Sequence, residues 1–285
     1  MTYNSTDRTF TWTCEWKNNW YDVECTANFG LPFDADQVAL WVKASELQNY
    51  NNEEEVSELT DIGWNNNHLE WAYADDWSKP VYNSWKNSIL WWKPTVYFDW
   101  KTSKNYFTND DLAEIAEKSH LLFIAFHPLN SGQEKYMAVL GFHGNDWTNK
   151  EVYFVKKDNG TIYHYDSNSE YTSNENFLDK NVILNVLLSN KAIAKITEVA
   201  SKKVISITNW EIKSFNDDLP TDVSKFTVWG EFDKKNGSIS EIWNLFNGHI
   251  AEIILIGDTT NEMDLNDDKI IEKAKEVRKY LKATY

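Results

Sequence analysis

The chain has 285 residues, of which 42% are hydrophobic, and its 28 basic and 44 acidic residues give a formal charge of −16 at pH 7. Such acidity repels nucleic acids and anionic membranes, so we exclude both as partners. The sequence has neither a signal-peptide pattern at its start nor an apolar run of about 18 residues that would cross a membrane. We therefore expect a soluble protein that is retained inside the cell.

The N-terminal region is rich in tryptophan, with eleven of the fifteen indoles in the first 100 residues. Residues 9–16 alternate with the period of a strand and residues 20–29 read as its return partner, which predicts a hairpin with one aromatic face. Cys14 and Cys25 flank the turn and could face each other across it. Two unbonded thiols in a reducing compartment are the favoured interpretation.

Residues 63–92 fit neither a helical nor a strand period, and their tryptophans have three candidate roles. They would pack the edges of the core, form contacts between subunits or line a ligand groove. The candidate contact aromatics are Trp64, Trp71, Trp77, Trp85, Trp91 and Trp92. Residues 46–59 are polar and acidic, which indicates a surface helix or a weakly ordered excursion.

The middle of the chain predicts buried strands. Residues 120–127 form a nearly continuous apolar run, typical of a strand that is buried on both faces. We expect residues 136–142 to be its antiparallel neighbour, which would bring His127 and His143 near each other. Before them, Asn109 or Asp110 is placed to cap a short helix over residues 111–118.

The stretch from 151 to 179 contains the strongest local signal. Two alternating runs, 152–155 and 161–165, flank Asp158-Asn159-Gly160, and this predicts a hairpin because Asn and Gly tolerate positive φ. Between residues 182 and 188 the apolar spacing is helical, which predicts a helix that covers one face of a sheet. Residues 226–231 and 238–243 predict a further hairpin.

An amphipathic helix, capped near Asp267 or Asp268, is expected at the C-terminus. Many short strands with inserted helices indicate a mainly β fold with α additions. We expect an antiparallel β-sandwich, jelly-roll-like, with inserted helices and the C-terminal helix. It would form a single domain over 1–285, with a core at about 93–218 on which the Trp-rich N-terminal residues 1–92 and a C-terminal extension, 219–285, pack.

The sequence carries no catalytic or cofactor signature. Its six histidines form no HxxxH or HExxH spacing and no CxxC is present, so we expect no metal. The adjacent acids Asp75-Asp76 and Asp217-Asp218 would point to opposite faces of a strand, which makes them poor acid–base pairs. We therefore predict no enzyme and no cofactor. The aromatic and Asn/Asp content fits a carbohydrate-binding module, which stays open as an alternative function.

Residues 151–188 resemble the polyhedrin and granulin family, the occlusion-body matrix proteins of insect viruses. The matching features are Lys156-Lys157 before a glycine-containing turn, the tetrapeptide Ser169-Glu170-Tyr171-Thr172, and Phe177 and Asp179 ahead of an apolar helix-like run. The order of elements extends the similarity to residues 93–142 and 204–218. The first 90 residues and those after Leu219 depart from the family pattern, which indicates a divergent member.

The resemblance implies a structural protein, not an enzyme. It would form trimers or larger homo-oligomers and self-assemble into crystalline occlusion bodies that enclose virions in the host cytoplasm or nucleus. Such crystals dissolve at alkaline pH, where lysine and tyrosine titrate at about 10.4 and about 10. The candidate pH-switch residues are Tyr153, Tyr163, Tyr165, Lys156 and Lys157, and the candidate assembly residues are those of the family motif.

Overall fold

The structure is a computed structural model in which most of the chain is described. The described residues are 2–4, 9–14, 23–28, 31–47, 49–63, 65–72, 79–84, 90, 92–99, 106–130, 136–144, 150–166, 169–172, 176–188, 203–207, 211–215, 222–229, 231–235, 238–243, 245–258, 261, 263–264 and 267–285. Among residues 2–28, 169–172, 203–215 and 231–243, the description covers the backbone alone. Contacts divide the chain into two units, Met1–Asp34 and Ala35–Tyr285.

The first unit contains a three-stranded antiparallel sheet in the order β1-β2-β3. Its strands are β1 (Thr2–Asn4), β2 (Thr9–Cys14) and β3 (Val23–Asn28), so the predicted N-terminal hairpin is confirmed. Cys14 lies opposite Val23 and Cys25 lies opposite Trp12. The two cysteines are therefore not cross-strand neighbours, because the register of the hairpin differs from the one that would place them face to face.

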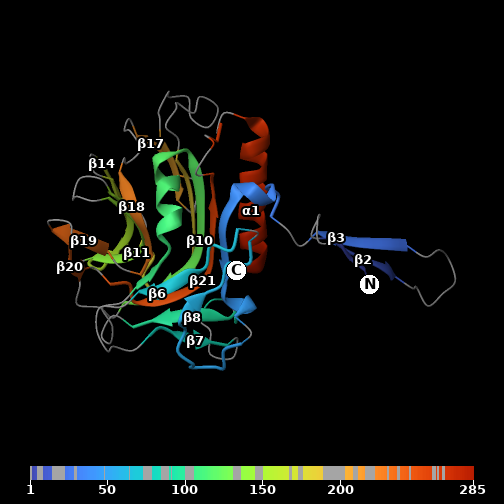
Figure 1. Ribbon diagram of the computed structural model, residues 1–285, viewed down its shortest axis with the longest axis horizontal. Coiled ribbons are helices and arrows are strands. Elements are labelled where there is room, and N and C mark those ends of the chain that lie inside the picture. The colour runs from blue at the N-terminus through green and yellow to red at the C-terminus, as the bar shows by residue number, and fades with distance from the viewer. Residues whose placement is uncertain are drawn as a thin grey trace. The chain divides into compact units, whose positions relative to one another are not determined.

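The second unit is an antiparallel β-sandwich of two eight-stranded sheets, which confirms the predicted fold class (Figure 1). The first sheet consists of β4 (Val38–Lys43), β7 (Val81–Asn83), β8 (Thr95–Phe98), β10 (His120–Pro128), β15 (Val182–Leu188), β16 (Lys203–Ile207), β17 (Glu211–Phe215) and β21 (Gly248–Ile256). The second consists of β5 (Glu58–Leu59), β6 (Leu69–Ala72), β9 (Tyr106–Thr108), β11 (Tyr136–Gly144), β12 (Lys150–Lys156), β13 (Ile162–Asp166), β14 (Ser169–Thr172) and β18 (Val223–Val228).

One hydrophobic core lies between the two sheets. From the first sheet, β10 contributes Leu122 and Ile124, and from the second sheet, β11 and β18 contribute Phe142 and Phe226. Each of these side chains is fully buried. Along β10, Leu122, Ile124 and Phe126 face this core, and the residues between them lie on the outer face of the sheet.

The predicted pairing of residues 120–127 with 136–142 is wrong. β10 lies between β15 and β21 in the first sheet, whereas β11 lies between β12 and β18 in the second. The chain crosses from one sheet to the other between β10 and β11. Apolar content cannot reveal this crossing, because strands of both sheets are buried and equally apolar.

Residues 182–188 form strand β15, not the predicted helix. β15 pairs with β10 from His120 to Phe126 and with β16 on its other side. Six of its seven residues are apolar, so they fit both a helix and a strand that is buried on both faces. The seven-residue length and the Val and Ile content suit the strand.

Two further expectations on strands and helices are corrected. β18 joins the second sheet, while β19 (Glu231–Lys235) pairs with β20 (Ser238–Trp243) in a separate two-stranded sheet, so the hairpin predicted for 226–231 and 238–243 begins later in the chain. No surface helix is present among the residues described in 46–59, where Glu46 alone is helical. It is the last residue of the short 3₁₀ helix η2 (Ala44–Glu46), and another 3₁₀ helix, η1 (Ala35–Gln37), precedes β4.

The two longer helices are where the sequence predicts them. η3 (Asp110–Glu117) is a 3₁₀ helix, and the side chain of Asn109 caps it by accepting a hydrogen bond from the Asp111 N–H at 3.0 Å. α1 (Asp268–Thr284) is capped by Asp267, whose side chain accepts from the Lys269 N–H at 2.9 Å. None of the described helices is both long and apolar enough to cross a membrane.

The C-terminal region of the chain is integral to the first sheet. β21 pairs with β10, β4 and β8, so it lies in the middle of that sheet and not at an edge. Glu252 of β21 is buried, and it accepts hydrogen bonds from Trp41 Nε1 at 2.7 Å and from the Tyr280 hydroxyl at 3.0 Å. Because Tyr280 belongs to α1, its hydrogen bond to Glu252 attaches the helix to the sheet.

Candidate functional site

The outer face of the second sheet carries a cluster of aromatic rings. Tyr136 of β11 stacks on Tyr163 of β13, with ring centroids 5.4 Å apart and an interplanar angle of 25°. Phe154 of β12 lies 5.8 Å from Tyr163, and Tyr165 lies 6.4 Å from it. We call Tyr136, Phe154, Tyr163 and Tyr165 the aromatic cluster. Phe154 and Tyr163 are buried, while Tyr136 and Tyr165 are half-buried and reach solvent.

Lys156 places a positive charge on this cluster. Its Nζ atom lies 4.4 Å from the ring centroid of Tyr163 and 6.0 Å from that of Tyr136. Both distances allow attraction between the ammonium group and the ring faces. Three of the five predicted pH-switch residues, Lys156, Tyr163 and Tyr165, therefore come together on one face.

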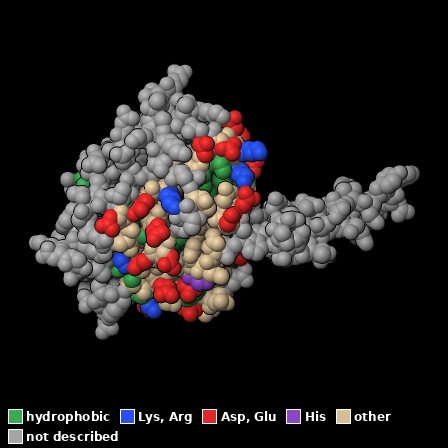
Figure 2. Space-filling view, turned by 45° about the horizontal axis from the view of Figure 1, so that its top comes forward, with side chains coloured by type: hydrophobic (Ala, Val, Ile, Leu, Met, Phe, Trp, Pro, Cys, Tyr) green, Lys and Arg blue, Asp and Glu red, His purple; other side chains and the backbone are tan. Residues whose placement is uncertain are grey.

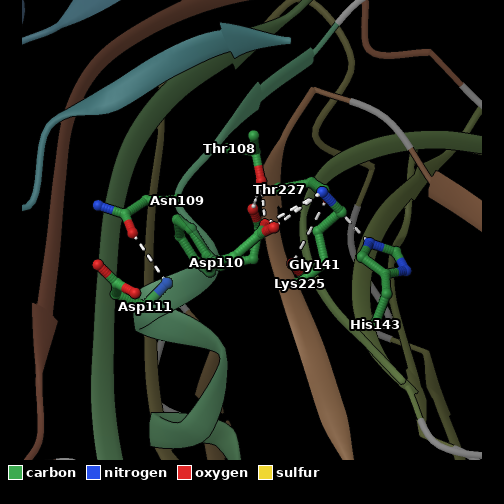
Figure 3. A network of polar contacts seen from close by, with 9 residues as sticks. Thr108, Asn109, Asp110, Asp111, Gly141, His143, Lys225 and Thr227 are labelled. Atoms are coloured by element: carbon green, nitrogen blue, oxygen red, sulfur yellow. Dashed lines mark hydrogen bonds and ion pairs between the residues drawn. The ribbon is translucent and has the colours of Figure 1, made fainter. Parts of the chain in front are cut away.

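A row of polar side chains continues along the same face (Figure 3). His143 Nε2 and Thr227 Oγ1 are 2.9 Å apart. The Thr108 hydroxyl donates to the Phe226 carbonyl oxygen at 2.7 Å, and it also lies 3.0 Å from Asp110 Oδ1. Lys225 Nζ lies 3.1 Å from Asp110 Oδ1. The polar row consists of Thr108, Asp110, His143, Lys225 and Thr227. The Lys225 side chain is 14% exposed and that of Asp110 57%, so this end of the row is open to solvent.

One rung of the sheet joins the polar row to the aromatic cluster. Five residues on neighbouring strands lie in register. They are Thr108 of β9, Thr227 of β18, Gly141 of β11, Val152 of β12 and Tyr165 of β13. Neighbouring strands are about 4.8 Å apart, so the rung spans roughly 19 Å. The aromatic and polar groups are therefore arranged along one strip, whose middle residues Thr227, Gly141 and Val152 are buried.

Gly141 shapes the middle of the strip. A Cβ atom at this position would lie 2.7 Å from His143 Nε2 and 3.1 Å from Val152 Cγ2. The absence of a side chain therefore lets the imidazole of His143 fold over the strand and reach Thr227. No local sequence pattern indicates this role, because it depends on partners from two other strands.

The first sheet carries a pair of histidines on its outer face. His127 of β10 lies directly opposite His249 of β21, and the ring centroids are 6.4 Å apart. His127 Nδ1 is 2.8 Å from Asn181 Oδ1, and His249 Nδ1 is 3.0 Å from Thr95 Oγ1. Burial lowers the pKa of both rings, that of His249 to about 4. The predicted approach of His127 to His143 is wrong, because their strands belong to different sheets.

A second buried polar cluster lies inside the sandwich. The Tyr153 hydroxyl donates to Glu151 Oε1, and the Nε2 atoms of His164 and His120 lie 3.6 Å and 4.0 Å from the same oxygen. All four residues are almost completely buried. Tyr153 is thus separated from Lys156, Tyr163 and Tyr165, because it points into the core while they lie on the outer face.

The residues of the family motif do not form one site. Ser169, Glu170, Tyr171 and Thr172 make up strand β14 at the edge of the second sheet, paired with β13. Phe177 is buried in the core, and Asp179 is exposed with a φ of 56°. Asp179 fixes a loop, since its Oδ1 atom accepts from the Asn130 N–H at 3.0 Å. The fifth predicted pH-switch residue, Lys157, is half-buried in the turn after β12.

The candidate contact tryptophans have different environments. Trp71 packs against the core and stacks on Trp229, with ring centroids 5.8 Å apart. Trp92 is 69% exposed and has a φ of 63°. Trp64, Trp77, Trp85 and Trp91 lie outside the described residues.

Among the described residues, no group of three or more His, Cys, Asp or Glu side chains is placed to hold a metal ion. Acidic side chains are spread over the face of the second unit that Figure 2 shows. This distribution agrees with the formal charge of −16.

Comparisons with known proteins find structural similarity alone. No family model and no curated protein matches the chain. A Trypanosoma rangeli sialidase in complex with 2,3-difluorosialic acid is 8% identical with a TM-score of 0.49, and the match covers 84% of this chain and 33% of the sialidase. The Ruminococcus gnavus IT-sialidase CBM40 bound to α2,3-sialyllactose is 10% identical with a TM-score of 0.37, covering 54% of this chain and 82% of that one. The chain thus spans about a third of the length of the trypanosomal enzyme.

Proposed function

We propose that this protein binds carbohydrate on the outer face of the second sheet. The observation that carries the proposal is the rung from Thr108 to Tyr165, which joins the polar row to the aromatic cluster. A saccharide presents apolar C–H faces and a rim of hydroxyl groups. Aromatic rings complement the first and hydrogen-bonding side chains the second.

The two ends of the strip have different tasks in this proposal. Tyr136 and Tyr165 are the half-buried rings of the cluster, so they offer the accessible surface on which a sugar ring stacks. At the other end, Lys225 and Asp110 form an ion pair that is partly exposed. In this proposal, hydrogen bonds from these two side chains to sugar hydroxyls replace part of the ion pair. His143 and Thr227 are buried, so they do not contact the sugar. Their hydrogen bond links β11 to β18 between the two ends of the strip.

The chemistry of the strip supports binding and not catalysis. Glycoside hydrolysis normally uses two carboxyl groups that face each other across the scissile bond. The polar row has a single carboxylate, Asp110, and Lys225 neutralises it at 3.1 Å. We therefore propose a binding module whose bound sugar leaves unchanged.

A glycan array tests this function. We expect the native protein to bind a defined subset of saccharides, and Tyr165→Ala to lose about 5-fold to 30-fold in affinity for them, since one stacking ring contributes about 1 to 2 kcal/mol. Trp92→Ala is the matched control, because it removes an exposed ring that belongs to neither the polar row nor the aromatic cluster. No binding to any saccharide by the native protein would contradict the proposal.

We propose self-assembly into an occlusion-body matrix as the second candidate. Trp92 favours it, because its indole is 69% exposed and tryptophan is enriched at contacts between subunits. Expression in insect cells should then yield intracellular particles that dissolve at about pH 10 to 11, where lysine and tyrosine titrate. Trp92→Ala should reduce their yield. A native protein that sediments as a monomer at all concentrations would contradict this candidate.

A further inference from the structure

We propose that His127 and His249 form an open site for a first-row transition-metal ion, with Cu²⁺ bound most tightly. The inference is independent of the proposed carbohydrate function, because the two residues lie on the outer face of the first sheet. Three features of the pair support such a site, namely the register of the two strands, the hydrogen bonds at the Nδ1 atoms and, in the described part of the chain, Nε2 atoms that make no hydrogen bond.

The register brings the two imidazoles to one place. His127 and His249 are directly opposed on antiparallel strands, and such pairs have Cβ atoms about 4.5 to 5.5 Å apart. Their ring centroids are separated by 6.4 Å. A metal ion bonded to two imidazole nitrogens at about 2.0 to 2.1 Å holds the ring centres roughly 5 to 6.5 Å apart. The observed separation of 6.4 Å lies within this range.

Polar contacts at the Nδ1 atoms orient the two imidazole rings. The amide oxygen of Asn181 is an acceptor, so His127 Nδ1 must donate to it, and the lone pair of a neutral ring is then on Nε2. Thr95 Oγ1 lies 3.0 Å from His249 Nδ1, and because a hydroxyl can accept as well as donate, this contact is compatible with the tautomer whose lone pair is on Nε2. Metal-binding histidines characteristically have their second nitrogen held by such a partner, which fixes the orientation of the ring.

The two Nε2 atoms make no hydrogen bond in the described part of the chain, and neither is completely buried. The two side chains are largely buried, with His127 6% and His249 5% exposed, so an ion would lie close against the sheet surface. Asp179 acts electrostatically on His127 and adds negative charge that favours a cation. Tyr97 packs on His249 with ring centroids 4.9 Å apart and limits its movement.

Two imidazoles leave the remaining coordination positions to water. This arrangement suits Cu²⁺ and, more weakly, Zn²⁺ or Ni²⁺, in agreement with the general order of affinities for nitrogen ligands. The site is open because, among the described residues, no third His, Cys, Asp or Glu side chain is placed to complete it.

Titration of the full-length chain with Cu²⁺ at pH 7, followed by calorimetry, tests the site. We expect one ion per chain, a loss of at least tenfold in affinity for His127→Asn or His249→Asn, and no site-specific binding in the double variant. Asn181→Ala should weaken binding about 10-fold to 100-fold, the usual effect of losing a partner that orients a ligand. His68→Asn is the matched control, because the His68 Nδ1 atom accepts from the Asp61 N–H at 2.9 Å and its removal should leave the affinity unchanged.

Electron paramagnetic resonance of the native protein with Cu²⁺ gives a second readout that requires no substitution. The proposal predicts hyperfine coupling to two imidazole nitrogens. Coupling to one imidazole, binding that survives in the double variant, or no binding by the native chain would each overturn it. Thermal unfolding without metal identifies any variant that fails to fold, and in that case the spectrum of the native protein decides.

Discussion

Tyr136 stacks on Tyr163 although the two residues belong to strands that are separated by β12. The rings therefore meet above the middle strand and, with Phe154 and Tyr165, cover it with aromatic surface. This relationship makes the outer face of the second sheet partly apolar. In the proposed function it supplies the surface against which a sugar ring packs.

Replacing Tyr163 tests how the aromatic cluster is held together. Tyr163 is buried and contacts Tyr136, Phe154, Tyr165 and Lys156. Tyr163→Ala should lower the free energy of unfolding by about 3 kcal/mol, because it removes a large buried ring. Tyr163→Phe retains the ring and should cost less than about 1 kcal/mol. Equal losses in the two variants, measured by urea denaturation, would show that the hydroxyl and not ring packing is decisive.

Gly141→Ala should disturb the polar row through His143. The new Cβ would lie 2.7 Å from His143 Nε2 and displace the ring from Thr227. We expect a loss of about 1 to 3 kcal/mol in unfolding free energy, measured by urea denaturation. In a His143→Ala background the same substitution should cost clearly less, since the clashing ring is gone. Additive effects of the two substitutions would contradict the proposed contact.

The attachment of α1 predicts sensitivity to alkali. Burial, followed by the charge of Glu252, raises the pKa of Tyr280. Because its pKa rises on folding, Tyr280 contributes stability that is complete below its unfolded pKa of about 10 and is lost as the pH climbs towards the folded value. Melting temperatures measured from pH 7 to 11 should therefore fall above about pH 10.

Tyr280→Phe separates this effect from general alkaline unfolding. The variant loses two contacts with Glu252, at 3.0 and 3.1 Å, and should be about 1 to 3 kcal/mol less stable at pH 7. It should also show a shallower decline above about pH 10. Tyr50→Phe is the matched control, because its hydroxyl is 3.4 Å from Ser57 near the surface and should change neither quantity. A native alkaline profile in Tyr280→Phe would contradict the role of Tyr280.

Local elements could be predicted from the sequence because their signals are local. The hairpin of β12 and β13 forms where Asn159 and Gly160 indicate a turn, and the reason is visible in the structure. Asn159 Oδ1 accepts from the Thr161 N–H at 3.1 Å, and Gly160 has a φ of 66°. A Cβ on Gly160 would lie 1.8 Å from Asn176 Oδ1, so the position requires glycine. The C-terminal helix is equally predictable from its Asp267 cap.

Sheet partners and the candidate site could not be predicted. Pairing of β10 with β21 joins residues more than a hundred positions apart. The apolar sequences of buried strands do not indicate which other strand each of them pairs with. For the same reason the sequence does not identify His249 as the neighbour of His127. Thr227 and Gly141 resemble ordinary strand residues until β11 and β18 are placed side by side.

Nuclear magnetic resonance of the native protein, titrated with the saccharide that binds best on the array, tests carbohydrate binding on the outer face of the second sheet without any substitution. We expect the aromatic resonances of Tyr136 and Tyr165 and the signals of Lys225 to shift together and saturate at one sugar per chain, while the indole signal of Trp92 stays unchanged. Shifts confined to Trp92, or to residues outside the strip from Thr108 to Tyr165, would contradict binding on this face.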